Sequence, residues 1–174
     1  MQINTMTIDN EANTTLTVYL HEEKPEFHRI DKRPFILVIP GGGYGFCSER
    51  EAEPIGLKFA AEGYHAGVLR YHVGEHRDFH KALADAEKSM DLIALLAEKA
   101  KIDQSKVAVI GFSAGGHLAA ALSTLSDRKP SACIPCLSGY LKLLCRSDED
   151  QGSFFRHVCD TANATYFFVF YIRR

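Results

Sequence analysis

Apolar residues along the chain fall into short runs separated by polar or helix-like segments. Residues 15–20 alternate between polar and apolar side chains, which predicts a half-exposed strand. Residues 35–39 are continuously apolar, which predicts a strand buried on both faces. The charged segment 21–33 between them has the composition of a surface loop. Three later apolar runs predict further strands, at residues 65–71, 106–110 and 131–137.

The segments between these strands have helical spacing. Ser48 and Glu51 form a capping box, which predicts a helix that begins there and ends before Gly63. Apolar residues recur every three or four positions within 79–101, and residues 114–125 predict a third helix. Strand and helix thus alternate from about residue 35 to residue 137, which predicts an α/β fold: a mostly parallel, doubly wound sheet with helices on both faces.

The pattern changes after Leu137. Residues 146–152 are nearly all polar, and no clear period follows until the aromatic run 166–172. We therefore expect one α/β domain over residues 1–174, in which residues 138–174 form a divergent or truncated tail.

Composition narrows the function classes. The 174 residues include 46% hydrophobic and 24% charged residues, which is typical of a globular domain with a substantial core. The net charge of −2 lacks the basic excess that nucleic-acid binding requires. No apolar run approaches the ~20 residues of a membrane span, and the odd number of cysteines, five, favours free thiols. We expect a cytoplasmic protein.

The strongest chemical pattern is Gly-x-Ser-x-Gly at Gly111, Ser113 and Gly115. It follows a buried strand directly and precedes a helix directly. A serine in such a tight turn needs small neighbours, and its hydroxyl is left exposed above the sheet near the positive end of the helix. Ser113 is therefore the candidate nucleophile.

Three consecutive glycines, Gly41–Gly43, end another buried strand. Backbone amides without nearby side chains can approach a reacting carbonyl oxygen closely and stabilise the negative charge that develops there. The amides of Gly42 and Gly43, together with that of Ala114 after the nucleophile, are the candidate oxyanion hole. We expect Ser113 to lie within reach of these amides.

Three stretches resemble the α/β-hydrolase family of acetyl esterases: PGGGY at 40–44, SEREA at 48–52 and GFSAGGHLA at 111–119. The resemblance covers about residues 14–137. It implies hydrolysis of small acyl esters, commonly on sugars, with Ser113 as nucleophile, with Gly42, Gly43 and Ala114 as oxyanion donors, and with neither cofactor nor metal.

Competing motif interpretations do not fit. A dinucleotide fingerprint beginning at Gly41 needs glycine where Phe46 stands, and a phosphate loop at 111–118 lacks its lysine. Cys133 and Cys136 have metal-ligand spacing, but they lie within a predicted strand, where residues three apart face opposite sides. We expect buried free thiols.

The proton relay is the missing part. In this fold the acid and then the histidine follow the serine. His157, preceded by Asp148 or Asp150, satisfies that order, whereas His117 is expected to have a packing role. Two alternatives stay open: an esterase by descent that is inactive or poorly active for lack of the acid and histidine, or a non-catalytic α/β binding or interaction module.

The aromatic run 166–172 has high β propensity and low charge. It can cap the exposed edge of the last predicted strand or pair with another chain. We expect it to pack on the exposed side of the sheet, with self-association as a consequence.

Overall fold

One twisted sheet organises the molecule. The computed structural model describes residues 1–22 and 31–137, together with the short strands at 166–167 and 170–171. Within these residues, the strand order is β1-β2-β4-β3-β5-β6-β7, and β8 also pairs with β6. The strands are β1 (Gln2–Asp9), β2 (Thr14–Leu20), β3 (Arg33–Ile39), β4 (His65–Arg70), β5 (Ile102–Phe112), β6 (Ala132–Leu137), β7 (Tyr166–Phe167) and β8 (Phe170–Tyr171).

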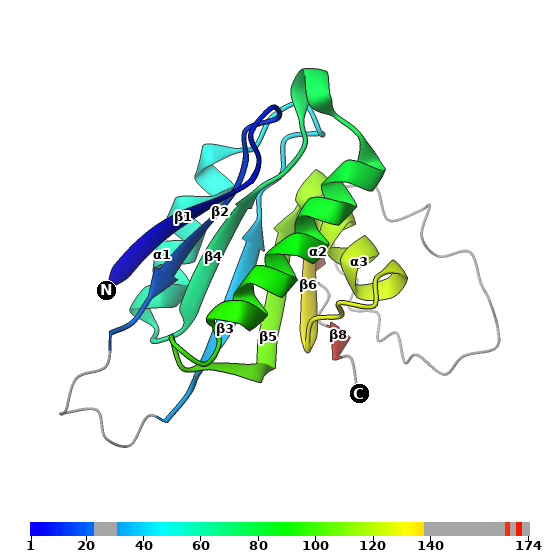
Figure 1. Ribbon diagram of the computed structural model, residues 1–174. Helices are drawn as coiled ribbons and strands as arrows, with labels where there is room; N and C mark the ends of the chain where they lie inside the picture. Colours follow the sequence, from blue (N-terminus) through cyan, green and yellow to red (C-terminus); the bar gives the residue numbers. More distant parts are fainter. Residues whose placement is uncertain (23–30, 138–165, 168–169, 172–174) are drawn as a thin grey trace.

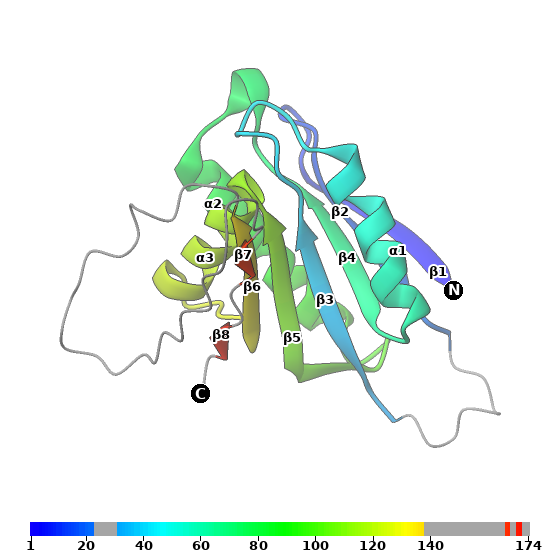
Figure 2. The ribbon, with the colours of Figure 1, turned by 180° about the vertical axis from the view of Figure 1, so that it is seen from behind.

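Helices cover both faces of the sheet. The helix α1 (Glu53–Ala61) lies on one face, and α2 (Phe79–Leu96) and α3 (Ala114–Leu125) lie on the other (Figures 1 and 2). Short 3-10 turns occupy Glu49–Glu51 and Gly74–His76. None of the described helices is both long enough and apolar enough to cross a membrane.

The central strands are buried on both faces, as the continuous apolar run in β3 predicts. Phe35 and Leu37 face the core beneath α2 and α3, whereas Ile36 and Val38 face the smaller core beneath α1. All four side chains are at most 5% exposed. Burial of this kind is the main stabilising contribution to such a domain.

The strand directions confirm the predicted fold class. The strands β4, β3, β5 and β6 run parallel to one another, and the described strands on either side of these four, β1 and β2 on one side and β7 and β8 on the other, pair antiparallel. The sequence pattern did not indicate β1, which pairs antiparallel with β2 at the edge of the sheet. Its residues are mostly exposed, so it lacks the apolar run that marks the inner strands.

The chain reverses its direction of winding at β3. From β3 it passes through α1 to β4 on one side, then returns through α2 to β5 on the other side. The carboxyl ends of β3 and β5 therefore lie side by side at a switch point, where α/β sheets usually place their ligands. The residues that follow these two ends are the glycine segment 41–43 and Ser113.

The tail contributes two short strands to the sheet. Tyr166 and Phe167 pair with the end of β6, and Phe170 and Tyr171 pair with its beginning. Both pairings are antiparallel. The backbone edge of β6 is thus covered within a single chain, as expected of a segment with high β propensity.

Candidate active site

Ser113 occupies the turn between β5 and α3. It is the single residue between the two elements, with φ 50° and ψ −114°, a combination that residues with side chains rarely adopt. The backbone holds it there, because its amide donates to the Cys136 carbonyl (2.7 Å) and its carbonyl accepts from the His117 amide (3.0 Å). Ser113 is exposed, as predicted. A strained, exposed serine at a strand-to-helix turn is typical of a nucleophile.

The flanking glycines are required by close backbone contacts. A Cβ on Gly111 would lie 2.2 Å from the Gly115 carbonyl oxygen. A Cβ on Gly115 would lie 2.2 Å from the Ile39 carbonyl oxygen and 2.4 Å from that of Pro40. The start of α3 therefore packs directly on the end of β3, and this contact brings Ser113 next to the glycine segment.

The glycine loop, residues 41–45, lies against Ser113. A Cβ on Gly41 would stand only 3.1 Å from the Ser113 Cβ and 2.6 Å from the Phe112 carbonyl oxygen. The loop then turns through Gly42 (φ 131°) and Gly43 (φ 62°), both in the region that favours glycine. The structure thus brings together the two segments that the sequence analysis selected.

Three backbone amides of the glycine loop and the nucleophile turn have no acceptor among the described residues. Ala114 is the first residue of α3, so its amide has no acceptor within the helix. Among the described residues, none accepts a hydrogen bond from the amide of Gly42 or Gly43. The catalytic roles of Ser113, Gly42, Gly43 and Ala114 stay predictions.

Polar side chains tie the glycine loop to the rest of the fold. The Tyr71 hydroxyl donates to the Pro40 carbonyl (2.9 Å). Burial raises the pKa of Tyr71, so the hydroxyl stays protonated and able to donate. At the other end of the loop, the Gly74 amide donates a hydrogen bond to the Tyr44 carbonyl (2.9 Å).

The predicted capping box does not form. The Ser48 side chain makes no cap hydrogen bond, and the chain passes through the 3-10 turn Glu49–Glu51 before α1 begins at Glu53. The Glu51 carboxylate accepts a hydrogen bond from the Gly41 amide instead (2.9 Å). A tertiary contact ten residues back along the chain has replaced the local contact that the spacing suggested.

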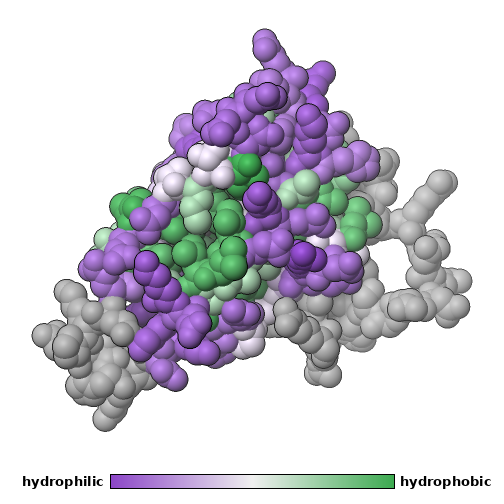
Figure 3. All heavy atoms as spheres, in the orientation of Figure 1, coloured by the Kyte–Doolittle hydropathy of each residue, from purple (hydrophilic) through white to green (hydrophobic). Residues whose placement is uncertain are grey.

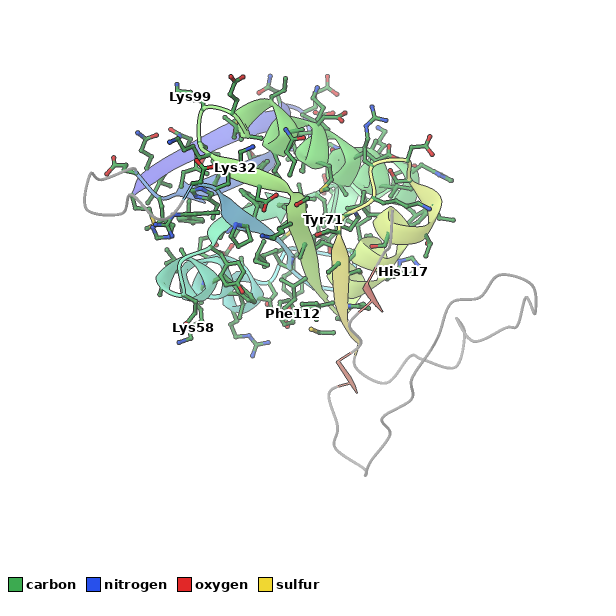
Figure 4. All side chains as sticks on the ribbon, turned by 90° about the horizontal axis from the view of Figure 1, so that it is seen from below. Lys32, Lys58, Tyr71, Lys99, Phe112 and His117 are labelled. Carbon is green, nitrogen blue, oxygen red and sulfur yellow. The ribbon has the colours of Figure 1, made fainter. Side chains whose placement is uncertain are left out.

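His117 contacts aromatic side chains rather than the serine hydroxyl. Its Nδ1 lies 2.9 Å from the Tyr44 hydroxyl, and its ring packs against Phe79 with centroids 5.3 Å apart. Figure 4 shows His117 on α3, whereas Phe112 lies on the face of the sheet that carries α1. These contacts fit the expected packing role.

The predicted relay residues Asp148, Asp150 and His157 lie outside the described residues. Within residues 1–22 and 31–137, no hydrogen bond joins the Ser113 hydroxyl to a histidine. The assignment of the acid and the histidine therefore stays a prediction.

The sequence analysis missed a buried histidine–aspartate pair. His72 follows β4 and Asp85 lies in α2, with side chains 5% and 4% exposed. One carboxylate oxygen accepts from the His72 Nδ1 (2.7 Å) and from the His72 amide (2.9 Å). The pair also lines a cavity of about 230 Å³ beside Asp9 and Lys81, which does not include Ser113. Thirteen residues separate His72 from Asp85, so no local spacing pattern in the sequence links them.

The two cysteines of β6 face opposite sides, as predicted. Cys133 packs in the core beneath α2 and α3, and Cys136 packs in the core beneath α1. Burial raises the pKa of each thiol to about 11. The spacing that resembles a metal-binding motif thus serves the two cores, and both thiols are free.

Comparison with known proteins places this geometry in a family. A family model described as BD-FAE matches residues 18–171. The acetylxylan esterase of Xylanibacter ruminicola is 32% identical over 92 residues, which are 52% of this chain and 19% of that protein.

Two solved structures are similar over most of the chain. One is MGS-M1, an alpha/beta hydrolase enzyme from a Medee basin deep-sea metagenome library, with TM-score 0.73 and 47% identity over 76% of this chain and 55% of that chain. The other is the acetyl ester-xyloside bifunctional hydrolase from Caldicellulosiruptor lactoaceticus, with TM-score 0.61 and 30% identity over 71% of this chain and 49% of that chain. The chain spans 17% of the endo-1,4-beta-xylanase B of Butyrivibrio fibrisolvens, to which it is 36% identical over 115 residues, and about half of these two structures. The matched family model and the shared fold together show that this chain belongs to the BD-FAE family and has the α/β-hydrolase fold.

Proposed function

We propose that this chain carries the nucleophile and oxyanion hole of a serine hydrolase acting on small carboxylic esters of the acetyl type. The supporting observation is the placement of a strained, exposed Ser113 against the glycine loop. The amides of Gly42 and Gly43 in that loop, and the Ala114 amide at the start of α3, have no acceptor among the described residues and are the donors we propose for the oxyanion. Each such donor contributes about 3 to 4 kcal/mol to transition-state stabilisation in enzymes of this kind.

The chemistry follows from this arrangement. The Ser113 Oγ attacks the ester carbonyl carbon, the carbonyl oxygen gains negative charge, and the backbone amides donate hydrogen bonds to it. Collapse of the tetrahedral intermediate releases the alcohol and leaves an acyl group on Ser113, which water then removes. A general base must take the serine proton in the first step and return it to the alcohol.

The base is the part that the described residues do not supply. We therefore expect this chain to be a poor esterase unless His157, with Asp148 or Asp150, completes the relay. Loss of a relay residue typically leaves a residual rate of ~10³ to 10⁴ over water, which comes from binding and oxyanion stabilisation.

Acylated sugars are the substrate class we propose. Two relatives are named for acetyl ester chemistry on xylan-type substrates, an acetylxylan esterase and an acetyl ester-xyloside bifunctional hydrolase. A cytoplasmic location is part of the proposal, and the free thiols of Cys47, Cys133 and Cys136 support it.

Hydrolysis of p-nitrophenyl acetate tests the proposal. The chain should release p-nitrophenol faster than buffer, and Ser113→Ala should abolish the excess. Ser105→Ala, which changes an exposed serine of β5, is the matched control and should have no effect. Equal rates for Ser113→Ala and the unchanged chain would refute Ser113 as the nucleophile. Turnover typical of an intact esterase that His157→Ala or Asp150→Ala abolishes would show that the tail completes the relay.

A non-catalytic interaction module is the second candidate. Apolar residues gather in the middle of the face that carries α2 and α3 (Figure 3). Leu95 of α2 and Leu125 of α3 are 78% and 69% exposed. Exposed apolar area of this kind favours association. Sedimentation of the unchanged chain and of Leu95→Lys tests this alternative: a shared monomeric state together with Ser113-dependent ester hydrolysis would exclude it.

A further inference from the structure

The half-buried Glu51 lies where a capping residue was predicted, but it serves the glycine loop. Its Oε2 accepts from the Gly41 amide at 2.9 Å, and a Cβ on Gly41 would lie 2.7 Å from the same oxygen. Gly41 itself is buried. Without this acceptor its amide would be a buried donor with no partner among the described residues, which is unfavourable.

The carboxylate completes a set of contacts that fix the start of the loop. The Tyr71 hydroxyl holds the Pro40 carbonyl, and the Ser48 amide holds the Gly41 carbonyl at 2.8 Å. The Gly45 amide closes the turn on the Gly42 carbonyl at 2.9 Å. These contacts occupy three consecutive carbonyls, and Glu51 occupies the Gly41 amide. The next two amides, those of Gly42 and Gly43, have no acceptor among the described residues and can donate to a ligand.

The location of Glu51 explains why one side chain can influence the whole site. Burial is the main cause that raises the pKa of Tyr71 and of Cys136, and the Glu51 carboxylate adds a smaller contribution to each. Tyr71 follows β4, and the carbonyl of Cys136 holds the Ser113 amide. A Cβ on Gly41 would lie 2.7 Å from the Glu51 Oε2 and 3.1 Å from the Ser113 Cβ, so the carboxylate lies close to both the glycine loop and the nucleophile turn.

We propose that Glu51 is a positioning residue: by holding the Gly41 amide it fixes the peptide planes of the glycine loop and so aims the Gly42 and Gly43 amides at the oxyanion. The proposal rests on the proposed function. The role needs an acceptor oxygen rather than a negative charge, because a carboxylate beside a developing oxyanion is electrostatically unfavourable. A Glu51→Gln variant should therefore keep the positioning role, whereas Glu51→Ala should lose it.

Two measurements on the full chain test the role. The first is hydrogen exchange of the Gly41 amide followed by NMR, and the second is kcat and KM for p-nitrophenyl acetate. Glu51→Ala should accelerate Gly41 exchange at least tenfold and lower kcat about 10- to 100-fold with KM within twofold, less than the ~10² to 10³ that loss of a donor itself removes. Glu51→Gln should keep both properties within about threefold, because its side-chain oxygen still accepts.

Glu49→Ala is the matched control, because this exposed glutamate lies in the same 3-10 turn and bonds Arg70 rather than the loop. It should change neither property. Unchanged Gly41 exchange in Glu51→Ala would overturn the proposal, and so would a Glu51→Gln variant as impaired as Glu51→Ala. The proposed function fails separately: if Ser113→Ala leaves ester hydrolysis unchanged while Gly41 exchange still responds to Glu51→Ala, Glu51 holds the loop but Ser113 is not the nucleophile.

Discussion

The buried pair of His72 and Asp85 predicts a large and specific loss of stability. Asp85→Ala removes the acceptor of two buried donors, the His72 amide and the His72 ring Nδ1–H, at 2.9 and 2.7 Å. The Thr14 hydroxyl, at 3.4 Å from the other carboxylate oxygen, loses a weaker contact. All three residues are buried, so the lost acceptor can be replaced only by water from the cavity that the pair lines.

The magnitude follows from these contacts. Each buried donor left unsatisfied costs about 1 to 3 kcal/mol. Two such donors and a small cavity give about 3 to 4 kcal/mol, a large part of the ~5 to 15 kcal/mol that stabilises a typical domain. For a chain of this length, that loss lowers the melting temperature by roughly 10 °C. Asp85→Asn keeps one acceptor oxygen and should lose less.

Urea unfolding followed by circular dichroism measures the effect. The matched control is Asp91→Ala, which removes an aspartate of the same helix that bonds Arg128 at the surface. Because exposed ion pairs contribute ~0 to 1 kcal/mol, this variant should stay near the unchanged chain. If Asp85→Ala loses no more free energy of unfolding than Asp91→Ala, the pair does not clamp α2 to the end of β4.

Three further outcomes can be measured. Gly115→Ala places a Cβ 2.2 Å from the Ile39 carbonyl oxygen, so it should lower the free energy of unfolding by about 1 to 3 kcal/mol and reduce ester hydrolysis in the same samples. Burial, with a smaller contribution from the nearby His21, lowers the pKa of His65 from an ordinary 6.5 to about 4. Between pH 4 and pH 6.5, His65 therefore binds a proton in the unfolded chain but not in the folded one. Stability should therefore be full above pH 6.5 and fall toward pH 4, by up to about 1.4 kcal/mol per pH unit, in urea titrations; His65→Asn should lack this slope. Deletion of residues 164–174 removes the strands that pair with β6 and should lower the melting temperature or change the oligomeric state in sedimentation, whereas a monomer of unchanged stability would show that the pairing contributes nothing.

The inner strands were predictable because burial on both faces requires a continuous run of apolar residues. A strand such as β3, covered on both faces, must be apolar at every position, and that run is visible without any partner. The turn at Ser113 was predictable for a related reason. A Cβ on Gly111 would meet the Gly115 carbonyl oxygen, so this constraint lies within five residues, and the Gly-x-Ser-x-Gly spacing shows it even though Gly115 also contacts the end of β3.

Other features depend on partners that are distant in the chain. The edge strand β1 is mostly exposed, so it leaves no apolar run and becomes a strand only by pairing with β2. Glu51 has the spacing of a capping residue, yet the Gly41 amide is a better-placed donor once the chain has folded. His72 and Asp85 meet only because α2 packs across the end of β4. Local sequence therefore determined the inner strands, the helices and the nucleophile turn. The edge strand and the hydrogen-bond partners of polar side chains were decided by tertiary packing, because an unpaired donor takes whichever acceptor the fold brings within about 3 Å.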